Sequence, residues 1–139
     1  MEITLTRPLP DGVGYISQWF GEHPEWYEKF GQVGHTGIDY AAPFGTPVLA
    51  AHNGIIYTGN DPDGYGLYVI VRGSKFQTLY AHLSSIEVTP KQEVVARQII
   101  GRLGSTGNST GNHLHFGLKV LSMRNPKYGN YIDPVPFRG

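Results

Sequence analysis

The chain has 139 residues, a length that fits one domain with its own core. Hydrophobic residues make up 40% and charged residues 16%, which is a globular composition rather than a disordered one. Because the formal net charge is +0, the sequence gives no electrostatic support for a nucleic-acid partner. Cysteine is absent, which excludes disulfides and thiolate chemistry and leaves His, Asp and Glu as candidate metal ligands.

The sequence carries no signal for a membrane span or for export. No stretch approaches the roughly 18 apolar residues that a membrane-spanning helix requires. Residues 1–7 lack the basic-then-apolar layout of a signal peptide. If the protein works outside a cell, a separate signal or another route must deliver it.

The pattern along the chain predicts a mostly β domain with antiparallel hairpins and little helix. Glycine, proline and tyrosine, with 19, 10 and 9 residues, favour short strands joined by turns. Residues 7–34 are expected to be irregular, apart from a short helical turn within 22–30. The predicted strands are 48–51, 54–58, 67–71, 76–82, 94–100, 101–103 and 113–121. Turns are predicted at 43–47, 60–64 and 72–75, a polar loop at 105–112, and a Pro-rich tail at the end. No repeat or linker divides the chain, so residues 1–139 are predicted to form a single domain.

Two histidines stand two positions apart in the last predicted strand. In a strand, side chains at i and i+2 point to the same face, so His113 and His115 can reach a common point. Leu114 then points to the opposite face, toward the core. Spacing alone leaves open which of the two histidines would bind a metal.

A second pattern pairs a histidine with a carboxylate. His35 and Asp39 are at i and i+4, a spacing that returns both side chains to one face of an extended segment. A catalytic zinc site needs about three protein ligands and one open position, and two His with one Asp meet that number. His23 and His52 have no partner at ligand spacing and are predicted to be turn or surface residues.

The surroundings of these residues resemble the lysostaphin-type (LytM-like) zinc metalloendopeptidases, which cleave peptidoglycan. The resemblance extends from about residue 15 to the end, with residues 1–14 as a lead-in. Its motifs, in the order of the family, are Gly34-His35-Thr36-Gly37-Ile38-Asp39, Tyr80-Ala81-His82-Leu83-Ser84, Ser105-Thr106-Gly107 with His113-Leu114-His115-Phe116, and the closing Tyr131-Ile132-Asp133-Pro134. One departure is Asn112, where the family often has proline.

The resemblance implies a role for each matching residue. His35, Asp39 and His115 would bind one zinc ion per chain, while His82 and His113 would be catalytic residues beside the metal. The fold that it implies is an antiparallel sheet that floors a substrate groove, with loops as the walls. This agrees with the strand pattern of the sequence.

The function that the resemblance implies is zinc-dependent hydrolysis of peptide bonds in bacterial peptidoglycan. Glycine bridges and stem-peptide cross-links both stay open as the bond that is cut. The alternatives are a non-catalytic cell-wall binding or activator module of the same fold, the wall-cutting domain of a phage structural protein, and a zinc peptidase with another peptide substrate. The expected partner is a peptidoglycan peptide, with no nucleic acid and no membrane span. A monomer that acts outside the cell, in the cell wall or in the periplasm is the favoured state.

Overall fold

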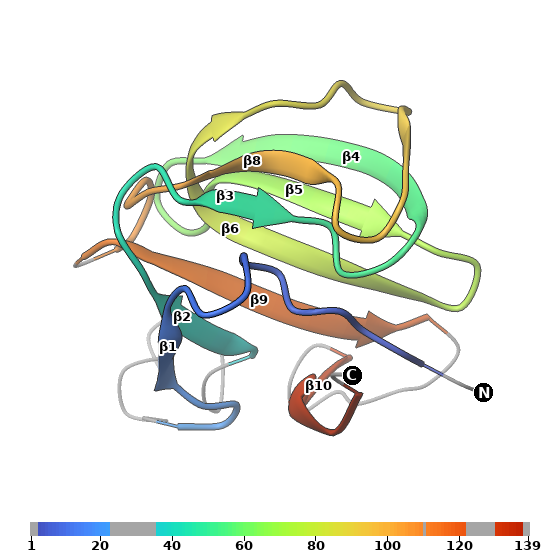
Figure 1. Ribbon diagram of the computed structural model, residues 1–139, viewed down its shortest axis with the longest axis horizontal. Coiled ribbons are helices and arrows are strands. Elements are labelled where there is room, and N and C mark those ends of the chain that lie inside the picture. Colours follow the sequence, from blue (N-terminus) through green and yellow to red (C-terminus); the bar gives the residue numbers. More distant parts are fainter. Residues whose placement is uncertain (1–2, 23–35, 110, 122–129, 138–139) are drawn as a thin grey trace.

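A computed structural model describes residues 3–22, 36–109, 111–121 and 130–137 (Figure 1). Strands dominate this part of the chain, as the turn-rich and aromatic-rich sequence predicted. The strands are β1 (Tyr15–Gln18), β2 (Ile38–Ala41), β3 (Pro47–Leu49), β4 (Gly54–Asp61), β5 (Gly66–Arg72), β6 (Phe76–Ile86), β7 (Glu93–Val94), β8 (Ile99–Leu103), β9 (His113–Val120) and β10 (Tyr131–Ile132). A short 3₁₀ helix, η3, covers Val135–Phe137. Within these residues, no helix is long and apolar enough to cross a membrane.

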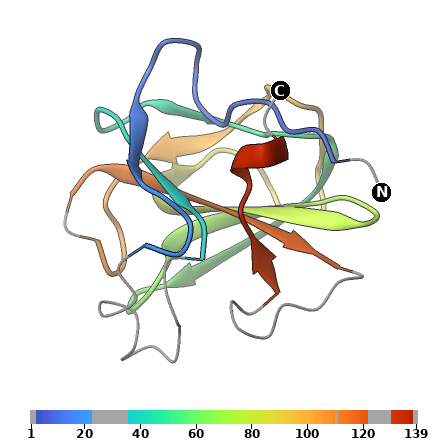
Figure 2. The same cartoon turned by 90° about the horizontal axis from the view of Figure 1, so that it is seen from below.

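All these strands belong to one antiparallel sheet, with the main order β1-β2-β9-β6-β5-β4-β7. The long strand β6 lies at its centre: its first part pairs with β5 and β9, and its last part pairs with β8. Strand β3 pairs with β8, and β10 pairs with β9. Figure 2 shows β10, in red, beside the end of β9, with η3 beyond it toward the N-terminal segment. The prediction of a mostly β, antiparallel domain is therefore confirmed.

The core lies on one face of the central strands. Alternate residues of β9 and β6 point into it, among them Leu114, Phe116 and Tyr80, which are essentially inaccessible to solvent. Val48 of β3 and Ile100 of β8 belong to the same cluster, so these two strands cover that face. The other face of β9 and β6 thereby becomes available for polar side chains.

Most predicted strands are present, although several boundaries differ. Strand β6 continues four residues beyond its predicted end, to Ile86, because its last residues pair with β8 instead of β5. The two predicted pieces 94–100 and 101–103 are divided differently, since a turn at 95–98 separates β7 from β8. Strand β1 falls in the segment expected to be irregular, and β10 in the expected tail. Both are short edge strands that form by pairing with β2 and β9. The helical turn predicted within 22–30 falls mostly outside the described residues.

His52 lies in a bend between β3 and β4, but the prediction that it could be a surface residue is wrong. The ring is buried, with only 7% of the residue exposed, and it packs against the ring of Phe76. Its Nδ1 lies 2.8 Å from the carbonyl oxygen of Asn53 and its Nε2 lies 2.8 Å from Thr78 Oγ1. The hydroxyl of Thr78 is 2.7 Å from that of buried Tyr80, which accepts a hydrogen bond from the amide of Ala51. His52 thus ends a buried polar chain.

This burial makes the stability of the fold depend on pH through His52. Burial lowers the pKa of His52 below 6.5, because a charged imidazolium loses its hydration in the core. The unfolded chain therefore binds the proton more readily, so the contribution is complete above about pH 6.5 and is lost as the pH falls. We expect the free energy of unfolding of wild type to decrease more steeply below pH 6.5 than that of His52→Gln.

The measurement is urea unfolding of both proteins at several pH values. Thr78→Val serves as the control, because it keeps the histidine and should keep the steep pH dependence while lowering stability at every pH. Parallel curves for wild type and His52→Gln would contradict the prediction.

Candidate active site

The pairing of β2 with β9 brings three of the predicted site residues together. Asp39 lies directly opposite His115, and Ala41 lies opposite His113. Directly paired residues point to the same face, so Asp39 and both histidines share the face opposite the core. Asp39 Oδ1 is 3.2 Å from His115 Nδ1, and Asp39 Oδ2 is 3.6 Å from His113 Nε2. The carboxylate therefore lies between the two imidazoles.

A β-bulge adds His82 to this group. Leu67 pairs with Leu83 and Val69 pairs with Tyr80, so one residue of β5, Tyr68, lies opposite two residues of β6. Those two are Ala81 and His82, and His82 has a left-handed backbone with φ of 64°. Strict alternation would send His82 to the core beside Tyr80, since Ala81 pairs with His115 on the outer face. The bulge turns the ring outward instead, to 4.7 Å from that of His113 and 6.3 Å from that of His115 (centroid distances).

Backbone carbonyls define the proton positions on two of these rings. His82 Nδ1 lies 2.7 Å from the carbonyl oxygen of Thr106, and His113 Nδ1 lies 3.0 Å from that of Gly111. A carbonyl only accepts, so each Nδ1 carries the hydrogen and each neutral ring has its lone pair on Nε2. Ser109 Oγ also approaches His113 Nδ1, at 3.1 Å. Both Nε2 atoms are therefore proton acceptors in the neutral site.

Burial keeps His82 uncharged near neutral pH. Burial, aided by the nearby His113 and His115, lowers the pKa of His82 to about 4, in spite of the hydrogen bond to Thr106. At neutral pH His82 is consequently an uncharged imidazole. Burial also raises the pKa of Tyr131, whose phenol lies near that of Tyr65, so Tyr131 stays protonated. Tyr65 in turn stacks on His115, with ring centroids 5.6 Å apart and planes 27° apart.

Close packing around the site explains why two motif positions, Gly37 and Gly107, are glycine. At Gly37, an added Cβ would collide with the carbonyl oxygen of Phe116 and meet His115 Cε1 at 3.0 Å, so only glycine lets β2 approach β9 this closely. Gly107 has a positive φ of 74°, and a Cβ added there would collide with the backbone of Gly66. Glycine therefore lets this loop lie close to the start of β5, where the Thr106 hydroxyl donates to the carbonyl of Leu83 at 2.6 Å. Thr106 is thus fixed to the bulged strand that it supports.

Sequence reasoning missed the contributions of Tyr65, Thr106 and Ser109. Thr106 stands in a quoted motif, and its neighbour Gly107 was a signal for a special backbone conformation. Tyr65 lies in a turn-rich loop, where nothing in the sequence connects it to His115. Four of the five predicted site residues come together in the structure: Asp39, His82, His113 and His115. The fifth, His35, lies outside the described residues, as does His23.

In the part of the chain that the structure describes, no group of three or more His, Cys, Asp or Glu side chains is placed to hold a metal ion. Two of the three predicted ligands, Asp39 and His115, are in contact there. The arrangement offers a carboxylate oxygen and an imidazole nitrogen as a pair of donors, with two neutral proton-accepting imidazoles beside them. Such a set suits hydrolysis of a carbonyl compound.

Relatives in sequence support a peptidase. The chain is 47% identical over 102 residues to the DD-carboxypeptidase/endopeptidase Mpg of Neisseria meningitidis, covering 73% of this chain and 22% of that protein. It is 44% identical over 87 residues to the peptidoglycan DD-endopeptidase ShyA of Vibrio cholerae, covering 62% of this chain and 20% of the relative. The chain thus spans about a fifth of the length of these curated relatives.

The fold has solved counterparts. Lysostaphin from Staphylococcus simulans superposes with a TM-score of 0.75 at 33% identity, covering 89% of this chain and 48% of that chain. The catalytic domain of the prophage-encoded M23 protein EnpA from Enterococcus faecalis gives a TM-score of 0.76 at 31% identity, covering 92% of this chain and 94% of the other.

The family model described as Peptidase family M23 matches residues 33–134, which contain all five predicted site residues. With the shared fold and the cluster on the outer face of β9, this match shows that the chain belongs to peptidase family M23.

Proposed function

We propose that this chain is a zinc-dependent endopeptidase that hydrolyses peptide bonds of bacterial peptidoglycan. The observation that carries the proposal is the convergence of Asp39, His82, His113 and His115 on one sheet face, with two Nε2 atoms as proton acceptors. The names of the relatives, a DD-carboxypeptidase/endopeptidase and a peptidoglycan DD-endopeptidase, support this substrate. They also favour stem-peptide cross-links over glycine bridges.

The donor atoms of the described residues fit zinc. Two ligand atoms bound at about 2.0–2.1 Å to a tetrahedral zinc ion lie about 3.3 Å apart. Asp39 Oδ1 and His115 Nδ1 are 3.2 Å apart, which is compatible with a shared metal. In our proposal His35, from the same motif as Asp39, is the third ligand. A solved structure described as a zinc containing peptidase from Vibrio cholerae, with a TM-score of 0.76 at 30% identity, also supports the choice of metal.

In this proposal zinc, when bound, supplies an acidified water and polarises the scissile carbonyl. The chain's own part is proton transfer and positioning. His82 and His113 present their Nε2 lone pairs toward the site, so either accepts the proton of the attacking water and later returns one to the leaving amine. Their Nδ1–H groups stay bound to backbone carbonyls throughout, which keeps both rings oriented. Once protonated, either imidazole also donates a hydrogen bond to the developing oxyanion.

The structure favours this enzyme over a non-catalytic binding module of the same fold. A left-handed backbone conformation costs a residue such as histidine roughly 1–2 kcal/mol. His82 adopts that conformation, and its ring faces two other histidines and a carboxylate. Such stored strain is typical of active sites. The proposed place of action is the cell wall or periplasm, where the substrate is found.

Digestion of purified peptidoglycan, with mass analysis of the products, tests the proposal directly. New amino termini at the cross-links are the expected result. Intact peptidoglycan after incubation with the zinc-loaded protein would overturn the proposal.

Removal of a ligand should remove metal and activity together. We expect Asp39→Ala, His115→Ala and His35→Ala each to bind far less than one zinc ion per chain, because the other two ligands cannot complete the site. Zinc content is measured by elemental analysis of the purified proteins after dialysis. Full zinc occupancy in Asp39→Ala would show that the ligand assignment is wrong.

Loss of a proton-transfer residue should separate metal binding from turnover. His82→Gln and His113→Gln should keep about one zinc ion per chain and lose about 10²–10⁴-fold in kcat, because glutamine does not accept a proton near neutral pH. Zinc content and kcat are measured on the same preparations. Loss of zinc in the His113 variant, with zinc retained in His115→Ala, would mean that the two roles are reversed.

A further inference from the structure

A row of side chains crosses the sheet on the same face as the active site. The pairs Arg72–Gln77 and Gln77–Lys119 are directly opposed on β5, β6 and β9. Lys119 in turn lies opposite Tyr131 of β10. Because Lys119 and His115 are four positions apart on β9, they point to the same face. The row therefore runs parallel to the Asp39–His115 pair, about 13 Å from it at about 3.3 Å per residue.

The two cations of this row have no acidic partner among the described residues. Arg72 is exposed, and Lys119 is partly exposed, with its ammonium 5.8 Å from the centre of the Tyr131 ring. Neither forms an ion pair within the described part of the chain, in contrast to Arg97 with Asp11 and Arg102 with Glu87. The amide of Gln77 lies between them, and adjacent strands are about 4.8 Å apart. A group above Gln77 would thus have a cation on either side.

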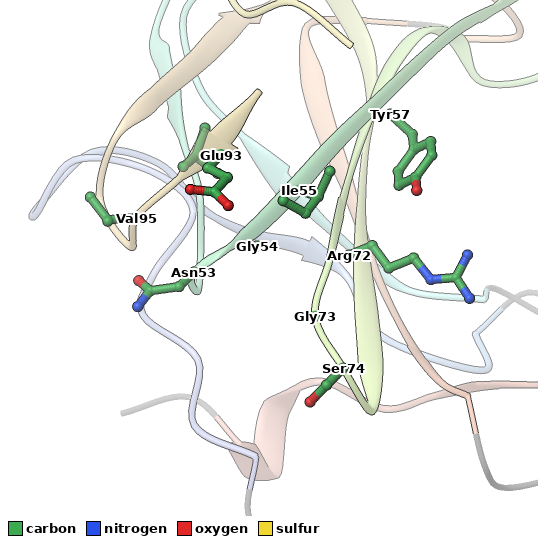
Figure 3. Close-up of a pocket in the computed structure, with 10 residues that line it drawn as sticks. Asn53, Gly54, Ile55, Tyr57, Arg72, Gly73, Ser74, Glu93 and Val95 are labelled. Atoms are coloured by element: carbon green, nitrogen blue, oxygen red, sulfur yellow. The ribbon is translucent and has the colours of Figure 1, made fainter. Parts of the chain in front are cut away.

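The surface next to Arg72 is open. A hollow of about 770 Å³ borders this residue and is lined also by Ile55, Tyr57 and Glu93. Figure 3 shows the guanidinium of Arg72 and the ring of Tyr57 on the same side of the β4–β5 hairpin. Glu93 pairs with Ile55 and so continues the row, but it lies three strands away from Gln77. That is about 14 Å, beyond the distance over which salt screens exposed charges.

We propose that Arg72, Gln77 and Lys119 form a subsite for a carboxylate of the peptidoglycan peptide, two same-face rows along the sheet from the Asp39–His115 pair. This inference rests on the proposed function. A carboxylate matches two flanking cations and a neutral amide donor, and Arg presents paired N–H groups suited to it. The separation of about 13 Å equals about four residues of extended peptide. Cleavage at the active site and recognition of a carboxylate on the same substrate are therefore compatible.

The subsite distinguishes the two kinds of substrate. A stem peptide ends in a carboxylate and carries another on the glutamate that is joined through its side chain, whereas a glycine bridge is uncharged. The row therefore selects stem-peptide cross-links. Either carboxylate has the chemistry that the row recognises, so the substrates of the test must separate them.

The test compares three synthetic cross-linked stem-peptide dimers: one with all carboxylates free, one amidated at the C-terminal residue, and one amidated at the glutamate. Wild type should cleave the free form with about tenfold higher kcat/KM than one of the amides, mainly through KM. The amide with the lower kcat/KM identifies the carboxylate that the row recognises. Arg72→Gln and Lys119→Gln should each lose about tenfold on the free form and change little on that amide.

Lys75→Gln is the matched control, because Lys75 is an exposed cation in the turn between β5 and β6, outside the row. It should retain the preference of wild type for the free carboxylate. Higher salt should reduce that preference. Equal cleavage of all three dimers by wild type, with Arg72→Gln indistinguishable from Lys75→Gln, would overturn the subsite and leave the proposed function standing. Absence of cleavage of every dimer and of purified peptidoglycan would instead overturn the proposed function.

Discussion

The register between β2 and β9 is the constraint on which the site depends. Asp39 faces His115 because Tyr40 pairs with Leu114 and Ile38 with Phe116, and these residues are buried in the core. A slip of one residue would move the core residues to the outer face and Asp39 and His115 into the core. The large cost of exposing a buried leucine and phenylalanine therefore holds the polar pair in place. Gly37 contributes by allowing the two strands to approach closely.

The bulge at His82 adds a residue that regular pairing would hide. Its left-handed backbone is held by several contacts. The amide of His82 donates to the carbonyl of Tyr65 at 2.7 Å, and its ring is held by Thr106. Thr106 is itself bonded to Leu67 and Leu83, which flank the bulge on its two strands. The ring is therefore held in one orientation, so little entropy would be lost in ordering it for the proposed reaction.

The outer face of the sheet combines different chemistries on one rigid support. The imidazoles and the carboxylate lie at the start of β9. The cationic row of Arg72, Gln77 and Lys119 lies toward the other end of that strand. Between them lie Gly117 and Leu79, which are buried but do not belong to the core cluster. Because strands hold their spacing firmly, the separation between the histidine cluster and the cationic row is set by the number of residues along β9.

The sequence by itself determined the fold class, the family resemblance and the polar identity of the site. Alternation in β9 was sufficient to place His113 and His115 on one face, because side-chain direction in a strand is a local property. Boundaries such as the end of β6 were not predictable, since they depend on a change of partner strand. Alternation alone would send His82 to the core beside Tyr80, so only the family resemblance predicted its place beside His113 and His115.

Beyond what the family resemblance implied for Asp39 and His115, only the tertiary structure decided which distant residues meet. The support of His82 by Thr106, like the contact of Asp39 with His115, joins segments far apart in the chain. The burial of His52 has the same origin: its neighbours in sequence form a polar turn, while Thr78 and Phe76, which surround its ring, come from β6. Strand pairing over long sequence separations produces such contacts, and local composition carries no record of the register in which two strands will pair.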